Sequence, residues 1–223
     1  MATPPSLDGA SLSPATLSLL AAGVLGALLF TVVYLVEGAT RPGYDAWTDA
    51  VSLLSLGPGG WVQRANFALF GLVTLLAAAP GWRRALRSGT AAVGHPALKA
   101  IEGLGLVVIG LRSQDPADGY PPGAPTPPRP TTSAEIHLFS SFVTITAIAL
   151  GSLLLARRLV VEPRWGRGWA VFIALFGWTS THGGPASLFE RLSTGVATLL
   201  AVLVVGRLPA QARPGGGEAP AGD

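Results

Sequence analysis

Three side chains able to do chemistry gather near one polar loop. Asp115 and Asp118 lie in that loop, and His137 follows it at the start of a long apolar run. An imidazole transfers protons near neutral pH and binds metal ions, and a neighbouring carboxylate can orient it. The three residues therefore predict either a binding site or proton-transfer chemistry. Each of them can equally lie in water at a membrane surface, where an ionisable side chain needs no partner.

The wider candidate site collects polar residues at the same ends of successive apolar segments. Its members are Asp49, Arg64, Asn66, Asp115, Asp118, His137, Glu190 and Arg191. Ionisable groups at a membrane edge are costly to bury unless they are paired, which makes such a cluster a functional hypothesis. Glu190 and Arg191 are adjacent and so point in different directions on a helix. We expect Arg191 to meet Asp115 or Asp49. We expect Glu190 to meet Arg64.

Several classes of chemistry are excluded or disfavoured. The chain contains no cysteine, so it forms no disulfide, thiolate metal site or thioether-linked haem. It also lacks a His-Glu-x-x-His helix, a Gly-x-Ser-x-Gly turn and a phosphate-binding glycine loop. A haem held by His137 and His182 is disfavoured, because haem-binding bundles place their histidines inside the span. Lys99 is the only lysine, and no basic block is long enough to follow a nucleic acid. We predict no catalytic residue, metal, cofactor or nucleic-acid partner.

The elements that must position these residues are apolar helices. Hydrophobic residues make up 49% of the 223 residues and charged residues only 12%, against about 25% in soluble domains. A membrane span needs about 20 apolar residues. Six segments fit: Thr16–Val36, Ala65–Ala79, Ala97–Leu111, His137–Ala156, Gly168–Thr181 and Leu188–Leu208. We predict an all-α polytopic membrane helix bundle with about six transmembrane helices, or four or five if the third or fifth segment only dips into the bilayer.

The flanking residues predict the boundaries and the orientation. Residues 1–13 and 209–223 are expected to be disordered, which leaves 14–208 as the transmembrane domain. The first span lacks a preceding basic region, so it is expected to be retained rather than cleaved as a signal peptide. Most arginines fall in the second and fourth connections and the tail. Because cytoplasmic loops are enriched in Lys and Arg, both termini are predicted to lie in the cytoplasm of a bacterial cell.

Shorter features refine this arrangement. Across Tyr44–Leu56 the polar residues and the apolar residues each recur at helical spacing, so the segment has two faces. This pattern predicts a short interfacial helix lying on the membrane surface, ended by Gly57-Pro-Gly-Gly60. Trp61 is expected to anchor at the headgroups. Glu102 follows Lys99 by three residues and is expected to pair with it near the cytoplasmic face. Pro121–Pro130 is predicted to be an extended, mobile insertion.

The order of these features resembles the bacterial domain-of-unknown-function family 998. The matching parts are the outer segment with Ser52 and Ser55, Trp61 followed by Asn66-Phe67, an aspartate beyond the third span, His137 opening the fourth, and Leu188-Phe-Glu-Arg-Leu192 opening the last. The family usually precedes that aspartate with an apolar-Phe-Pro sequence, where this chain has Arg112-Ser-Gln-Asp115-Pro. Asp115 and Asp118 are therefore both candidates for the equivalent position. The resemblance implies the topology of about six spans, and it brings no established reaction.

Three functions remain from these observations. The first is a non-enzymatic membrane module that binds a lipid or a partner protein at an outward-facing polar site. The second is a membrane enzyme or redox protein that uses His137 with Asp115 or Asp118. The third is a small transporter, which is disfavoured because no span shows a midplane charge. Ala22-x-x-x-Gly26 permits close helix contact, either within the bundle or across a homodimer.

Overall fold

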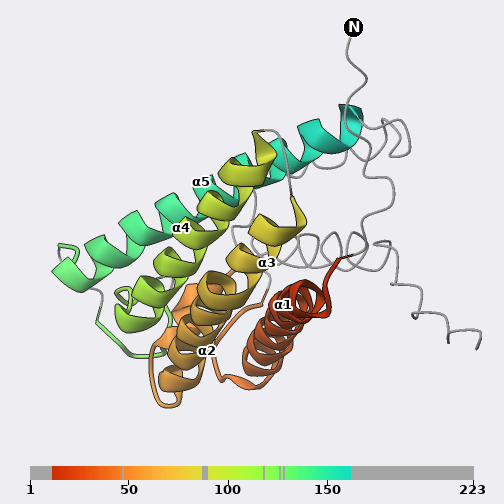
Figure 1. Cartoon of the computed structure of the whole chain (residues 1–223). Coiled ribbons are helices and arrows are strands. Elements are labelled where there is room, and N and C mark those ends of the chain that lie inside the picture. The colour runs from red at the N-terminus through yellow and green to blue at the C-terminus, as the bar shows by residue number, and fades with distance from the viewer. Residues whose placement is uncertain are drawn as a thin grey trace, which may run out of the picture.

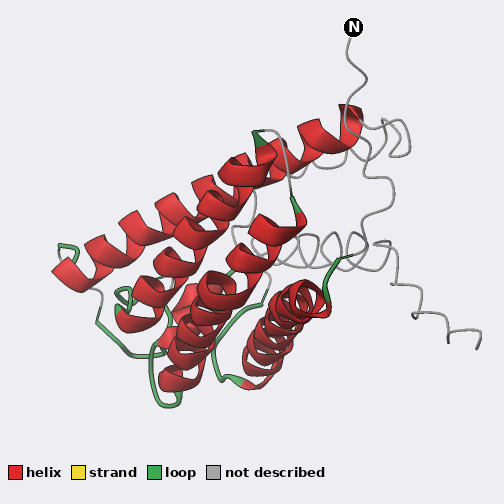
Figure 2. Ribbon diagram, in the orientation of Figure 1, coloured by secondary structure: helices red, strands yellow, loops and turns green. Residues whose placement is uncertain are grey.

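A computed structural model describes residues 12–161 except 47, 87–89, 118, 126 and 128. Its α-helices are α1 (Pro14–Thr40), α2 (Gly60–Val73), α3 (Ala79–Ala85), α4 (Ala91–Leu111) and α5 (Thr132–Val161). A 3-10 helix, η1 (Val51–Ser55), precedes α2, and a π-helical turn, η2 (Thr74–Ala78), joins α2 to α3. The described residues contain helices and loops and no strand, which confirms the all-α class (Figure 2). The fifth and sixth predicted spans and both predicted disordered ends, apart from Leu12 and Ser13, lie outside the described residues.

Four helical stretches are long and apolar enough to cross a membrane. They are Pro14–Thr40, Gly60–Ala85, Ala91–Leu111 and Thr132–Leu155. The first four predicted spans are therefore confirmed as helices, and each is longer than predicted. The helices continue into their polar flanks because backbone hydrogen bonds do not depend on side-chain polarity. Ser13 shows this at the start of α1, where its hydroxyl accepts a hydrogen bond from the Thr16 amide at 3.2 Å and caps the helix.

The second span continues past Ala79, through Pro80 and Gly81, to Ala85. The wider π-helical turn before them lets the chain continue into α3, where Pro80 occupies one of the first positions and needs no amide donor. Gly81 lies against α1, and a Cβ atom there would approach the Leu20 side chain to 3.1 Å. This glycine thus marks close helix contact and not a helix end.

The helices lie side by side in the order α1, α2, α4, α5, with α4 in contact with both α2 and α5 (Figure 1). Glycines permit the close approach that membrane helices use. A Cβ atom on Gly103 of α4 would lie 2.8 Å from the Gly71 carbonyl oxygen of α2. A Cβ atom on Gly26 would lie 2.8 Å from Cγ1 of Val73, so this glycine of the small-residue pattern serves contact inside the bundle.

The bundle has an apolar exterior and polar groups inside. Large apolar side chains such as Leu29, Leu104 and Phe142 are exposed. Buried polar side chains include Gln63, Asn66, Thr74, His95, Glu102, His137 and Thr144. In water such an exterior would leave large apolar patches uncovered, whereas hydrocarbon solvates it well. The distribution therefore supports a protein that lies in a membrane.

One end of the bundle is covered by two connections that we call the cap, residues 41–59 and 112–131. The cap covers one hydrophobic cluster of the core. Its members are Tyr44, Val51, Leu53, Leu54 and Tyr120 from the cap and Phe30, Tyr34, Phe67, Leu106 and Ile109 from the helices. The Tyr44 and Tyr120 rings meet edge to face at 5.5 Å and join the two connections. The Ser52 hydroxyl also donates to Oε1 of Gln114, at 2.9 Å.

The predicted surface helix over residues 44–56 is wrong in extent and in burial. Only Val51–Ser55 is helical, and Leu53 and Leu54 are 1% and 0% exposed. Residues 112–131 pack over part of this segment, where Gln114 accepts from Ser52 and Tyr120 meets Tyr44. Trp47, which falls within the predicted helix, lies outside the described residues.

The insertion at Pro121–Pro130 also differs from the prediction at its start. A Cβ atom on Gly57 would lie 3.3 Å from Cγ of Pro121, and Pro122 is in similarly close contact with Gly43. Gly43 and Gly57 both adopt positive φ, at 77° and 69°, which glycine tolerates without strain. The two glycines therefore make room for the prolines, and this part of the loop is fixed to the cap.

Candidate functional site

Five members of the predicted polar site lie in the described residues: Asp49, Arg64, Asn66, Asp115 and His137. Asp118, Glu190 and Arg191 lie outside them, and so do the contacts predicted for Glu190 and Arg191. His182 lies outside as well. The positions of the five described residues show which of them share a surface and which serve the fold.

Asp49 and Asp115 each close a turn in the cap. Asp49 is 5% exposed, and its Oδ2 accepts a hydrogen bond from the Asp45 amide at 2.8 Å. The carboxylate of Asp115 accepts from the Thr131 amide at 2.8 Å and from the Thr131 hydroxyl at 2.7 Å. The same hydroxyl accepts from the Ala134 amide and caps the start of α5. Asp115 thereby joins the two ends of its loop.

His137 and Arg64 both bind the last turn of α4. Nδ1 of His137 donates to the Arg112 carbonyl oxygen at 2.6 Å, which leaves Nε2 as an acceptor. That Nε2 is buried without a partner. Nε of Arg64 donates to the Gly110 carbonyl oxygen at 3.4 Å. The ring of His137 and the carboxylate of Asp115 thus have different hydrogen-bond partners, so the pair expected for an enzyme is not formed between these two.

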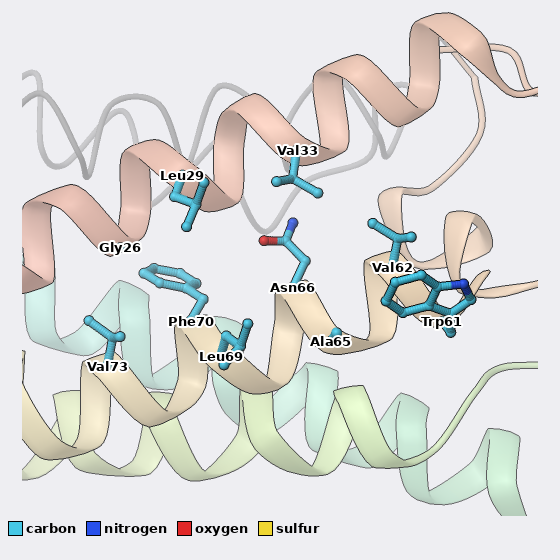
Figure 3. A pocket seen from close by; sticks show the side chains of 10 residues that line it. All are labelled: Gly26, Leu29, Val33, Trp61, Val62, Ala65, Asn66, Leu69, Phe70 and Val73. Carbon is cyan, nitrogen blue, oxygen red and sulfur yellow. The ribbon is translucent and has the colours of Figure 1, made fainter. Parts of the chain in front are cut away.

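Asn66 is the predicted site residue that lines a groove. The groove runs between α1 and α2 and has a volume of about 200 Å³. Figure 3 shows Asn66 among apolar side chains from both helices, with Trp61 at one end and Val73 at the other. Nδ2 of Asn66 donates to the Phe30 carbonyl oxygen at 3.0 Å and to Oε1 of Gln63 at 3.2 Å. Both amide hydrogens are used, so only the amide oxygen can serve a ligand.

Sequence reasoning missed the ion pair that holds the cap. Arg41 donates to Oε1 of Glu37 at 3.1 Å, and both side chains are 11% exposed. The guanidinium also donates to the carbonyl oxygens of Leu54, Leu56 and Pro58. Burial raises the pKa of the Tyr120 phenol, and nearby Arg41 opposes that shift. The available signal was the spacing of four residues between Glu37 and Arg41 at the end of an apolar span.

A second missed feature lies inside the bundle. Nδ1 of His95 lies 3.0 Å from the Gly151 carbonyl oxygen of α5, and its ring meets Trp82 edge to face at 4.9 Å. Nζ of Lys99 lies 2.8 Å from Oε2 of Glu102, which confirms the predicted local pair. Its expected place near one face is wrong, because Glu102 is the twelfth of the 21 residues of α4. A buried carboxylate thus lies midway along a span, where no midplane charge was expected.

No group of three or more His, Asp or Glu side chains in the described residues is arranged to hold a metal ion. The polar side chains most relevant to function form three separate arrangements in the described residues. These are the Glu37–Arg41 pair under the cap, the groove with Asn66, and the line of buried polar residues between α4 and α5.

Comparison with known proteins identifies the family. The chain belongs to the family described as Protein of unknown function (DUF998), whose model matches residues 24–207. The match begins within α1, extends through the other three described spans and continues beyond them. No curated protein and no solved structure matches the chain.

Proposed function

We propose that this member of the DUF998 family is a six-span protein of a bacterial plasma membrane that binds a membrane lipid and is not an enzyme. In this proposal both termini lie in the cytoplasm and the cap faces outward. The end of the bundle opposite the cap carries Arg83 and Arg84, as expected of a cytoplasmic side. The predicted outward-facing polar site then corresponds to the open end of the α1–α2 groove.

The observation that carries the proposal is the match between the groove and one lipid chain. Along α2 the lining runs from Trp61 to Val73, about 18 Å at 1.5 Å per residue. One leaflet of the hydrocarbon core is about 15 Å thick. The volume, about 200 Å³, is below the range of roughly 300–1,000 Å³ typical of drug-sized ligands. A single acyl chain fits this shape better than a bulky cofactor does.

The open end of the groove suits the polar part of a lipid. Trp61 is 70% exposed, as expected of a tryptophan at the level of the headgroups. Arg64 does not line the groove, because its guanidinium binds the Gly110 carbonyl oxygen of α4. The amide oxygen of Asn66 is positioned to accept a hydrogen bond from a lipid hydroxyl. The enzyme hypothesis has less support, because Asp115 and His137 bind different backbone and hydroxyl groups.

The proposal is tested by filling the groove. Ala65 lines it, so Ala65→Leu adds volume inside it, whereas Leu76→Phe adds volume at an exposed position of η2 outside it. After a delipidation step, we expect native mass spectrometry to show one phospholipid still bound to the wild type and to Leu76→Phe. Ala65→Leu is expected to lose that lipid. Retention of the same lipid by Ala65→Leu, or its absence from the wild type, would contradict the proposal.

A further inference from the structure

The contact between α4 and α5, which we call the seam, is fixed by three cross-helix contacts. His95 meets the Gly151 carbonyl oxygen, Gly105 lies against Thr144, and His137 meets the Arg112 carbonyl oxygen. Around the axis of α4, at 100° per residue, Glu102 falls between Gly105 and His95, both of which contact α5. Glu102 is 3% exposed. The seam therefore buries a carboxylate between two histidines that lie near its ends.

The seam also holds buried polar atoms without hydrogen-bond partners. They are Nε2 of His95, Oγ1 of Thr144 and Nε2 of His137. Such atoms are uncommon in folded proteins, and each one calls for a reason. Three of them on one helix contact, from residues spaced along its whole length, are hard to explain as isolated packing defects. They are explained if each atom exchanges a proton with its neighbours in the seam.

The polar side chains recur about once per helical turn. From the cap end the order is His137, Ser140, Thr144, Glu102, Lys99 and His95, as set by the three cross-helix contacts. Successive levels differ by three or four residues, which is about 4.5–6 Å along the axis. Such a step is spanned by side-chain rotation or by one bridging water. From the level of Arg112 to His95 the series covers about 26 Å of a hydrocarbon core about 30 Å thick.

We propose that the α4–α5 seam is a proton-transfer path across the membrane, with Glu102 as its central proton acceptor. A proton from the cap side binds Nε2 of His137, passes along the hydroxyls of Ser140 and Thr144, and neutralises the Glu102 carboxylate. The next transfer runs through bridging water past the level of Lys99 to Nε2 of His95, about 10 Å further along the axis. Release of that proton to water leaves the Glu102–Lys99 ion pair restored. One proton enters for each that leaves, and no oxidant or reductant is needed. Arg112 and Asp115 lie near the cap end, and Arg83 near the other.

This path is independent of the lipid groove, because it lies between α4 and α5 and not between α1 and α2. Buried ionisable residues in a span carry proton relays in many pumps and transporters, and each hydroxyl here can both donate and accept. Nζ of Lys99 lies 2.8 Å from Oε2 of Glu102, so a positive group stands beside the central carboxylate of the path.

The test is proton flux through the full-length protein in liposomes that contain a pH-sensitive dye, driven by a potassium diffusion potential. We expect flux above that of protein-free liposomes for the wild type, and a loss of at least about tenfold for Glu102→Gln, because a positioned proton-transfer group contributes that much or more. Glu135→Gln removes an exposed carboxylate at the start of α5 and is expected to keep the flux. Wild-type flux equal to that of empty liposomes, or full flux in Glu102→Gln, overturns the proposal.

A second variant separates proton transfer from folding, since Glu102→Gln leaves Lys99 without its partner. Thr144→Val has nearly the same shape and removes only a hydroxyl oxygen that has no partner. If Thr144 has only a structural role, Thr144→Val is expected to have an unchanged or raised melting temperature and unchanged proton flux. The relay predicts an equally stable protein with flux reduced several-fold, and recovery of flux in Thr144→Ser. A folded Thr144→Val variant with wild-type flux would overturn the proposal.

Discussion

Arg41 shows how a single charged side chain can organise a membrane protein at its surface. Its guanidinium binds Glu37 and three carbonyl oxygens, that of Leu54 in η1 and those of Leu56 and Pro58 in the loop before α2. Those carbonyls belong to a segment that has few backbone partners of its own, so the arginine satisfies them in place of water. Lysine could not do this equally well, because it lacks the planar set of five donors.

Replacing Arg41 is expected to destabilise the protein more than replacing Glu37. Arg41→Met leaves Glu37 buried without its partner, and breaking a buried pair typically costs about 3–5 kcal/mol. Glu37→Gln keeps an acceptor for the guanidinium and is expected to cost about 1 kcal/mol. Chemical unfolding in detergent micelles measures both free energies.

Arg112→Met is the control for this comparison, because Arg112 is exposed and its role in the described contacts comes from its backbone carbonyl. It is expected to change the free energy of unfolding by less than about 0.5 kcal/mol. If Arg41→Met were no more destabilising than Arg112→Met, the guanidinium would not be what holds the cap.

At the scale of elements, the spacing between helices depends on what faces each glycine. Gly103 of α4 faces backbone, because a Cβ atom there would lie 2.7 Å from the Leu75 amide nitrogen and 2.8 Å from the Gly71 carbonyl oxygen. Gly94, on the same helix, faces only Cδ1 of Leu154, at 2.7 Å, which is the end of a flexible side chain. Backbone inside a helix cannot move aside alone, whereas a leucine can change its rotamer.

The two glycines therefore predict opposite effects of the same substitution. Gly103→Ala forces α2 and α4 apart and is expected to destabilise the protein by about 1–3 kcal/mol, as overpacking does. Gly94→Ala gains helix propensity and is expected to stabilise it by up to about 1 kcal/mol. Thermal unfolding of the two purified variants shows directly whether each substitution raises or lowers the stability. A stabilising Gly103→Ala would mean that α2 and α4 do not approach as closely as the structure shows.

At the scale of the whole molecule, the length of the apolar runs predicted the four described helices but not the cap or the buried polar contacts between them. Runs of apolar residues are local, so they identified the spans well. The cap depends on contacts such as that between Ser52 and Gln114, which are 62 residues apart, and no local pattern reveals them. The seam was visible in principle. His95 and Glu102 are seven residues apart, as are His137 and Thr144, which places each pair on one face of a helix.

The orientation and the number of spans can be tested together, because the chain has no native cysteine. A membrane-impermeant maleimide added to intact cells is expected to label Arg129→Cys, which lies in the exposed part of the cap. Thr90→Cys, at the opposite end between α3 and α4, is expected to react only after permeabilisation. Labelling of Thr90→Cys alone in intact cells would reverse the proposed orientation, which rests on the distribution of arginines.

Ser187→Cys extends this test to the residues that follow α5. This position lies between the fifth and sixth predicted spans, so it faces outward only if the segment Gly168–Thr181 crosses the membrane. A protein with six spans is expected to be labelled there in intact cells, and a protein with four spans only after permeabilisation. Asp223→Cys is the control, because an even number of spans leaves the C-terminus in the cytoplasm in both cases. Labelling of Ser187→Cys together with protection of Asp223→Cys therefore distinguishes six spans from four, whereas protection of both would contradict the six-span proposal.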